Sequence, residues 1–157
     1  MPNRICIHWT AGNLNVSRDD SMAYHFISDG NGVIHDGHYT PEDNDNLFDG
    51  YARHTRFGNT KTIGVAVCGA YKGYKFGAMT RVSFEAMLKK VAELCKRYSI
   101  PITEFTVYHH WEFEQRLSVK RRSGKQDITS IPWKPDLKKE EVGRYIRQSV
   151  LWYYNRL

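Results

Sequence analysis

Histidines that follow strand-like segments are the side chains of this sequence best suited to chemistry. His8 comes directly after the apolar run ICI, and the pair His109 and His110 follows the segment TVY. A carboxylate, Asp127, comes soon after this pair. Two imidazoles and one carboxylate leave the fourth position of a tetrahedral Zn²⁺ open, which is the arrangement of hydrolytic rather than structural zinc sites. The spacing by itself leaves two interpretations open, a metal site and hydrogen-bonded core histidines.

Apolar and β-branched runs predict the strands that must position these side chains. The first run, ICI, does not alternate with polar residues, so we expect a strand that is buried on both faces. The turn signal DGN predicts a hairpin between the second and third strands. The five predicted strands span residues 4–8, 24–28, 32–37, 62–70 and 104–110.

Helical periodicity occurs in two segments. The first runs from Thr80, a candidate N-cap, to about Tyr98. The second runs from Asp136, the expected N-cap, to about Asn155, and its acidic start and basic end suit the helix dipole. The remaining segments are predicted as loops at residues 11–21 and 69–77, and as a loop with a short helix at residues 40–60.

The composition is that of a folded protein. The 157 residues suit one domain, and 41% hydrophobic with 25% charged residues excludes the disordered and membrane-embedded classes. The net charge of +6 favours an anionic partner, such as nucleic acid, a phospholipid or an acidic cell-wall polymer. Basic runs at residues 120–125 and 134–139 carry much of this charge, and solvated loops would explain them equally well.

The cysteines and the N-terminus bear on the cellular compartment. Cys6, Cys68 and Cys95 are odd in number and lack Cys-x-x-Cys spacing, so we expect reduced, buried thiols rather than a disulfide framework. The first residues lead into a strand without the apolar stretch of a secretory signal, and no run reaches transmembrane length. We therefore expect synthesis in the cytoplasm without a signal peptide.

Five separated motifs resemble one family of enzymes when they are taken in order. The strings IHWTAGN, YHFISDGNGVIHDG, NTKTIGVAVCG, VYHHWEF and GKQDI are similar to motifs of the zinc-dependent N-acetylmuramoyl-L-alanine amidases, the family shared by amidase-type phage lysozymes and peptidoglycan-recognition proteins. The resemblance covers roughly residues 4–133, and the final helix, at about 136–155, resembles that of small phage endolysins. It implies a single amidase domain over residues 1–157.

The family resemblance also implies a fold and a reaction. The fold is of the α/β class, with a central mixed β-sheet flanked by helices and a zinc site in a groove at the sheet edge. The reaction is hydrolysis of the amide that joins the lactyl group of N-acetylmuramic acid to L-alanine.

The resemblance assigns the zinc ligands to His8, His110 and Asp127. His8 matches the first ligand, at the end of the first strand. His110 matches the second in a string similar to Thr-His-x-Glu-Phe, with His109 where a threonine is usual, so the register is ambiguous by one residue. We favour His110, because a strand alternates its faces and only one of the two histidines can point at the metal. Asp127 matches the third ligand, and otherwise would be an exposed loop carboxylate.

Two further residues match positions near the reacting groups in the family. Lys125 matches a lysine that faces the substrate carbonyl in the phage branch, where a fixed ammonium stabilises the oxyanion; a solvated lysine is the alternative. Tyr24 matches a tyrosine near the attacking water, and a phenol with a pKa near 10 is a poor base unassisted. Another branch has a catalytic glutamate in the strand that here reads TIGVAVCG, so this chain is expected to rely on Tyr24 and Lys125. His25, on the opposite strand face, is expected to be structural.

Five residues are candidates for binding substrate. His54, Thr55 and Asn59 match a stretch that lines the substrate groove in relatives, although a polar loop beside a strand is equally suited to be scaffold. Trp9 and Thr10 follow the ligand strand and would form the near wall of the groove, and Trp9 would equally well cap the core.

The expected function is zinc-dependent cleavage of peptidoglycan by a phage or prophage endolysin. We expect a monomer that is made in the host cytoplasm, acts on the cell wall after release, and suits a thin, Gram-negative type of wall. A cytoplasmic muropeptide-recycling amidase and a non-catalytic peptidoglycan-binding module are the alternatives. A nucleic-acid-binding domain is also conceivable from the charge, but no nucleic-acid motif is present, and we expect no specific nucleic-acid partner.

Overall fold

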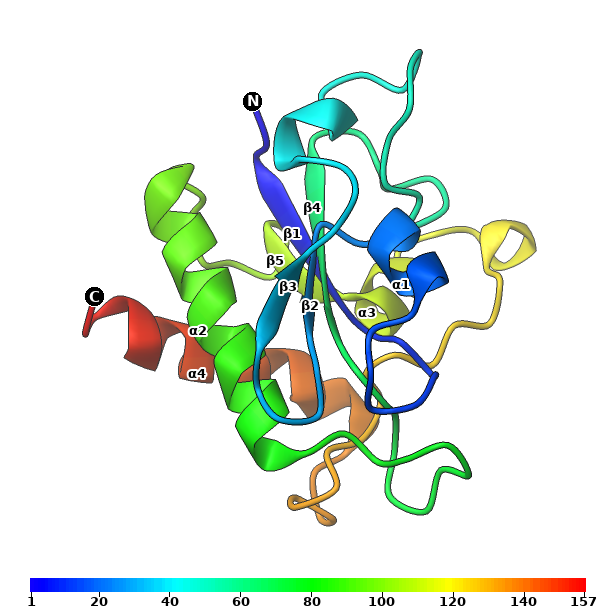
Figure 1. Cartoon of the computed structure of the whole chain (residues 1–157), viewed down its shortest axis with the longest axis vertical. Coiled ribbons are helices and arrows are strands. Elements are labelled where there is room, and N and C mark those ends of the chain that lie inside the picture. Colours follow the sequence, from blue (N-terminus) through cyan, green and yellow to red (C-terminus); the bar gives the residue numbers. More distant parts are fainter.

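A five-stranded mixed sheet forms the centre of the computed structural model, which describes residues 1–157 (Figure 1). The strands span Arg4–Trp9 (β1), Phe26–Ser28 (β2), Ile34–Asp36 (β3), Thr62–Val67 (β4) and Val107–His109 (β5). They lie in the order β3-β2-β4-β1-β5. β1 is parallel to both β4 and β5, β2 is parallel to β4, and β3 forms an antiparallel hairpin with β2. The predicted α/β fold, mixed sheet and hairpin are confirmed.

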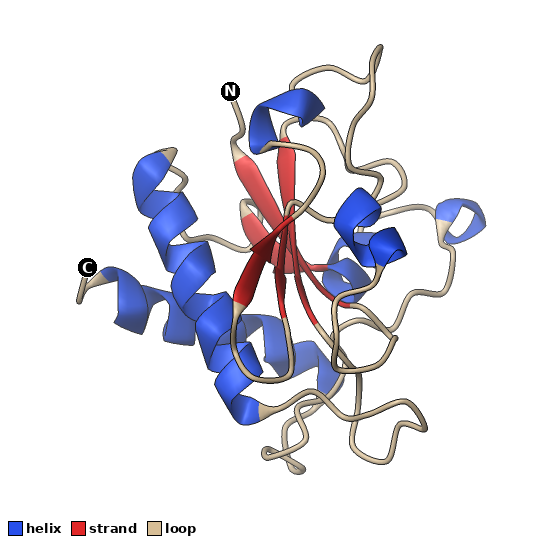
Figure 2. Ribbon diagram, viewed as in Figure 1, coloured by secondary structure: helices blue, strands red, loops and turns tan.

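Helices flank this sheet, as Figure 2 shows. The four α-helices span Arg18–Ala23 (α1), Arg81–Arg97 (α2), His110–Glu114 (α3) and Val142–Tyr154 (α4). The long helices α2 and α4 pack on each other, and residues of both join the strands in one large core. α2 begins as predicted, because the Thr80 hydroxyl accepts a hydrogen bond from the backbone N–H of Ser83. No helix combines the length and apolar character that a membrane-spanning segment needs.

β1 is buried on both of its faces, as its unbroken apolar run predicts. Ile5 and Ile7 belong to the large core under α2 and α4. Cys6 and His8 occupy the alternate positions and therefore point to the opposite face of the sheet. Each of these four residues is at most 1% exposed. His8 is thus presented by a strand that packing holds from both sides.

Two short helices lie where the sequence analysis did not place them. α1 falls in the segment predicted as loop, because Ser17 and Asp20 form a capping box that outweighs the polar composition. β5 ends at His109, one residue before the predicted strand end, because α3 begins at His110. The second difference bears on the site, since it turns the two neighbouring histidines in different directions.

The C-terminal helix starts later than predicted. Asp136 was the expected N-cap, yet α4 begins only at Val142, after a 3-10 turn over Lys139–Glu141. The backbone N–H of Lys138 donates to the Glu141 carboxylate at 3.0 Å, and this capping interaction begins the turn. The turn therefore starts where the Glu141 side chain can accept the otherwise free backbone N–H of Lys138. The side chain of Asp136 makes no such hydrogen bond.

The buried side chain of Asn44 stabilises the long loop between β3 and β4 through hydrogen bonds to the loop backbone. Asn44 lies at the end of a short 3-10 helix, Pro41–Asn44, which confirms the short helix predicted for this loop. Its buried amide donates to the carbonyls of Ala52 and Asn59 and accepts from the Ala52 N–H. His25 donates to the same amide oxygen at 3.0 Å and accepts the Gly64 N–H at 2.9 Å. His25 therefore has the structural environment predicted for it, and the loop is tied to the sheet.

Candidate metal centre and groove

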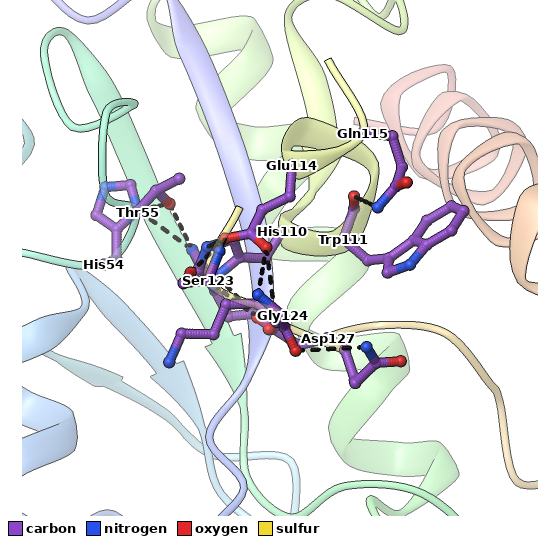
Figure 3. A network of polar contacts seen from close by, with 12 residues as sticks. His54, Thr55, His110, Trp111, Glu114, Gln115, Ser123, Gly124 and Asp127 are labelled. Carbon is purple, nitrogen blue, oxygen red and sulfur yellow. Dashed lines mark hydrogen bonds and ion pairs between the residues drawn. The ribbon is translucent and has the colours of Figure 1, made fainter. Parts of the chain in front are cut away.

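His8, His110 and Asp127 meet beside the ends of β1 and β5, the latter an edge strand of the sheet. Figure 3 shows His110 and Asp127 with polar residues around them. The Nδ1 atom of His8 lies 2.8 Å from Oδ2 of Asp127, and the Nδ1 atom of His110 lies 3.5 Å from the same oxygen. One donor atom from each residue lies within 4.8 Å of the other two. All three side chains are buried. The arrangement brings together the three residues predicted as metal ligands.

The charge states of these groups suit a cation. Burial lowers the pKa of His8, against the opposing effect of Asp127, so the imidazole is neutral near pH 7. Burial would raise the pKa of Asp127, but the neighbouring imidazoles of His110 and His8 outweigh it and hold the pKa well below its usual range. Neutral imidazole and ionised carboxylate are the forms in which these side chains bind a metal.

A hydrogen-bond chain sets which nitrogen of His8 is free. Nε2 of His54 lies 3.0 Å from the carbonyl of Thr62, which only accepts, so this nitrogen carries the proton. Nδ1 of His54 then accepts from the Thr55 hydroxyl at 2.7 Å. Nε2 of His8 lies 3.2 Å from that hydroxyl oxygen and therefore donates to it. The lone pair of His8 is then left on Nδ1, which lies 2.8 Å from Oδ2 of Asp127, so both atoms are available to one cation.

His110 has an outer partner in Glu114. Its Nε2 atom is buried without a hydrogen bond and lies 3.7 Å from Oε2 of Glu114, one helical turn away on α3. The Glu114 carboxylate is 2% exposed and accepts hydrogen bonds from the backbone of Ser123, Gly124 and Lys125 and from the Ser123 hydroxyl. A carboxylate behind a ligand histidine is a common support of metal sites. Glu114 was not predicted from the sequence, and its only signal there was a spacing of four residues from His110, which brings the two side chains together on a helix.

His109 points away from the cluster. Its Nδ1 atom accepts the backbone N–H of Ile128 at 3.1 Å, and burial lowers its pKa to about 4. The structure thus brings His110, not His109, to His8. The reason given from the sequence was incomplete, because His110 is not a strand residue: the chain turns into α3 there.

A second group of candidate donors lies deeper. Cys6, His8 and His54 also bring their donor atoms within 4.8 Å of one another. All three cysteines of the chain are free and buried, and burial raises the pKa of the Cys6 thiol far above its usual range. Cys6 does not line the groove, whereas His110 and Asp127 do. His8, His110 and Asp127 therefore form the candidate metal site that lies next to the groove.

A groove of about 310 Å³ opens above this cluster. It brings together seven of the residues named from the sequence with two tyrosines that were not named. Its principal lining residues are Trp9, Thr10, Tyr24, His54, Tyr71, Tyr74, His110, Lys125 and Asp127. The loop over residues 69–77 was predicted, but the position of its tyrosines beside the candidate metal site was not, since only the fold brings that loop to β1.

Thr55 and Asn59 do not line this groove, and of the two alternatives left open by the sequence, groove wall and scaffold, they have the second. Thr55 is fully buried beneath the cluster, where its hydroxyl bridges His8 and His54. Asn59 accepts the Thr55 N–H at 2.8 Å and lines a separate hollow. Both residues support the loop that carries His54. Trp9 has both of the roles predicted for it. It belongs to the large core and also lines the groove.

Tyr24 lies next to the cluster, with its ring centroid 5.1 Å from that of His8. Burial raises the pKa of its phenol far above the usual range, so the hydroxyl keeps its proton. It can therefore donate a hydrogen bond in the groove but cannot act as a base near neutral pH. Lys125 lies in the groove wall two residues before Asp127.

A family model for N-acetylmuramoyl-L-alanine amidases matches residues 1–128. The chain belongs to this amidase family. The matched part includes all three candidate metal ligands and ends before α4. The family assignment makes the chain an enzyme of the N-acetylmuramoyl-L-alanine amidase type, which acts on peptidoglycan.

Solved structures share the fold of this amidase. The endolysin of bacteriophage Ph2119 from Thermus scotoductus MAT2119 is 13% identical with a TM-score of 0.57, over 95% of this chain and 84% of that one. The amidase LysC from Clostridium intestinale URNW is 17% identical with a TM-score of 0.54, over 85% and 80%. The ectodomain complex of peptidoglycan recognition proteins LCa and LCx, solved with tracheal cytotoxin, is 20% identical with a TM-score of 0.51, over 80% and 77%. No curated protein sequence matches the chain significantly.

Proposed function

We propose that this amidase is zinc-dependent, with His8, His110 and Asp127 as its ligands. The observation that carries the proposal is the convergence of two imidazole nitrogens on one buried carboxylate oxygen beside a groove. Two nitrogens and one oxygen are a donor set that zinc accepts with one position left for substrate or water. When bound, zinc supplies a Lewis acid that polarises the substrate carbonyl and lowers the pKa of water toward ~7.

Residues of the groove supply the rest of the chemistry. The ammonium of Lys125 stabilises the negative charge that develops on the carbonyl oxygen of the scissile amide. The phenol of Tyr24, which keeps its proton, donates a hydrogen bond that orients the attacking water or the reacting carbonyl. Thr55 holds His8 in the tautomer that leaves Nδ1 free. His54, whose ring edge reaches the groove, contacts the substrate and anchors Thr55.

The biological role that we propose is that of an endolysin, made in a bacterial cytoplasm and acting as a monomer on the wall after release. The net charge of +6 suits a polyanionic wall. The shared fold with the endolysin of bacteriophage Ph2119 supports this role over that of a recycling enzyme. Peptidoglycan recognition proteins have the same fold, which makes a binding module without catalysis the second candidate.

One experiment tests the reaction and the metal together. Zinc is quantified in the purified protein, which is then incubated with purified sacculi with and without a chelator, and new chain ends are identified by mass spectrometry. We expect free L-alanine amino termini that form only when metal is present and return when zinc is added back. Zinc-free protein that binds sacculi but releases nothing, even after added zinc, would identify a recognition module instead.

A second assay separates the endolysin from a recycling amidase. Intact sacculi and soluble muropeptides are offered in parallel at equal amounts of scissile bond. An endolysin should clear the turbidity of the sacculi. Cleavage of soluble muropeptides with no action on sacculi would reject the endolysin role and favour recycling.

A further inference from the structure

One side of the groove is built from aromatic rings, which we call the aromatic wall: Trp9, Tyr71 and Tyr74. The ring centroids of Trp9 and Tyr71 lie 5.9 Å apart, and those of Tyr71 and Tyr74 lie 5.1 Å apart. All three residues line the groove. Tyr71 is 46% exposed, so a large part of its ring faces solvent rather than core.

The loop that carries the two tyrosines is firmly held. Backbone bonds join Ala70 to Gly77 at 3.0 Å and Met79 to Ala70 at 2.9 Å, which closes the loop at its base. The Tyr74 hydroxyl donates to the carbonyl of Ala11, in the turn that leaves β1. The loop is therefore pinned both to itself and to the strand of His8, and the exposed ring of Tyr71 is presented in one place.

A different loop supplies a polar side of the same groove. Gly124, Lys125 and Gln126 line it next to Asp127, and the buried Glu114 accepts the backbone N–H groups of Gly124 and Lys125. Figure 1 shows the loop after β4, in green, and the segment around residue 120, in yellow, projecting from the molecule at separate places. The groove thus has an aromatic side and a polar, cationic side, with the candidate metal centre on its floor.

We propose that the aromatic wall is a saccharide subsite, which takes the sugar part of the substrate, while the side of Lys125 takes the peptide. This inference rests on the proposed amidase function. The scissile amide joins a sugar-linked lactyl group to a peptide, so the two parts must leave the metal centre in different directions. Pyranose rings present apolar C–H faces that pack on aromatic rings, and an amphipathic tyrosine also bonds their hydroxyls. A peptide, by contrast, offers carbonyls and carboxylates to an ammonium and to backbone N–H groups.

Two substrates with the same scissile bond test the assignment. One is a disaccharide tetrapeptide, and the other is the matching D-lactoyl tetrapeptide, which lacks the sugars. Tyr71→Ala should lower kcat/KM for the disaccharide peptide about tenfold, the upper end of what one aromatic contact contributes. The same variant should leave kcat/KM for the lactoyl peptide within about twofold, because a contact to the sugar is absent there. Tyr71→Phe, which keeps the ring but loses the hydroxyl group, should lose less of kcat/KM for the disaccharide peptide than Tyr71→Ala does.

Phe105→Ala is the matched control, since Phe105 is 64% exposed and does not line the groove. It should change neither rate, and circular dichroism with thermal unfolding verifies the fold of each variant. An equal loss on both substrates in Tyr71→Ala, or no loss on either, would overturn the saccharide subsite.

A binding measurement keeps this inference separate from the proposed function. The tetramer of N-acetylglucosamine, which has no peptide and no scissile amide, is titrated calorimetrically into the unmodified protein and into Tyr71→Ala. Saturable binding that the variant weakens supports the subsite even if the protein cleaves neither amide, in which case the amidase proposal alone fails. Tetramer binding that is absent, or equal in both proteins, overturns the subsite even if amide cleavage is normal.

Discussion

Glu114 links a candidate metal ligand to the loop of Lys125: its Oε2 atom lies 3.7 Å from Nε2 of His110, and its carboxylate accepts the backbone N–H groups of Ser123, Gly124 and Lys125. One buried side chain thus orients two parts of the site that are distant in sequence from each other. A carboxylate is needed there, because only acceptors can meet several N–H groups at once.

Glu114→Gln should loosen this loop and weaken metal binding. The glutamine amide places a donor against backbone N–H groups, so we expect faster tryptic cleavage within residues 120–125 of the folded protein. Loss of the outer partner of His110 should raise the dissociation constant for zinc by roughly 10-fold to 100-fold in competition with a chelator. Glu93→Gln, on the exposed side of α2, is the control. Unchanged proteolysis and zinc affinity would show that Glu114 does not support the site.

His8→Ala should abolish both zinc retention and amide hydrolysis, because it removes a donor atom from the centre of the cluster. Zinc content by elemental analysis and L-alanine amino termini by mass spectrometry are the measurements. His35→Ala is a suitable control, since His35 lies on β3 with its side chain 43% exposed. A His8→Ala protein that keeps stoichiometric zinc and full activity would disprove the ligand assignment.

Lys125→Ala should keep its zinc but hydrolyse the amide more slowly, by ~10²-fold or more, because removal of a donor to an oxyanion costs about that much. The loss should fall on kcat rather than on KM if the ammonium acts mainly on the charge of the transition state. Lys120→Ala tests whether any loss comes only from reduced basic charge. Equal turnover in both variants would make Lys125 an ordinary solvated lysine of a basic loop.

The metal-free protein should lose stability in mild acid through His25. Burial lowers the pKa of this residue from 6.5 to about 4, against the weaker effect of the bond to Asn44. Its folded-state pKa lies below the unfolded value, so the unfolded chain binds the proton first. The free energy of unfolding is therefore fully retained above pH 6.5 and falls between pH 6.5 and 4, by at most about 1.4 kcal/mol per pH unit for one group.

Urea unfolding with a chelator present, repeated from pH 7 to pH 4.5, measures this slope. His25→Gln should flatten it, and the slope that remains should include the contribution of His109, whose pKa is also lowered to about 4. His38→Gln, on a surface loop, is the control. An identical slope in His25→Gln would show that His25 does not titrate with unfolding.

The main elements of the fold could be predicted because their signals are local. Apolar and β-branched runs indicated all five strands, and the apolar spacing after Thr80 indicated α2 and its cap. The ICI run predicted that β1 is buried on both faces, which the packing confirms. His8, His110 and Asp127 were assigned from the resemblance of the motifs to the amidase family, since their spacing alone left core histidines as an alternative.

Contacts between segments that are distant in sequence decided the remaining features of the site. A local sequence pattern does not indicate such contacts. The turn from β5 into α3 directs His110 toward His8 and leaves His109 bonded to Ile128. Packing puts Thr55 beneath His8, 47 residues away in sequence, rather than in the groove. The loop of Tyr71 reaches the site only because β4 pairs with β1. The sequence by itself determined which residue types are available for binding a metal and a substrate. The tertiary structure decided which of them meet and how they are oriented, because orientation depends on partners brought together only by folding.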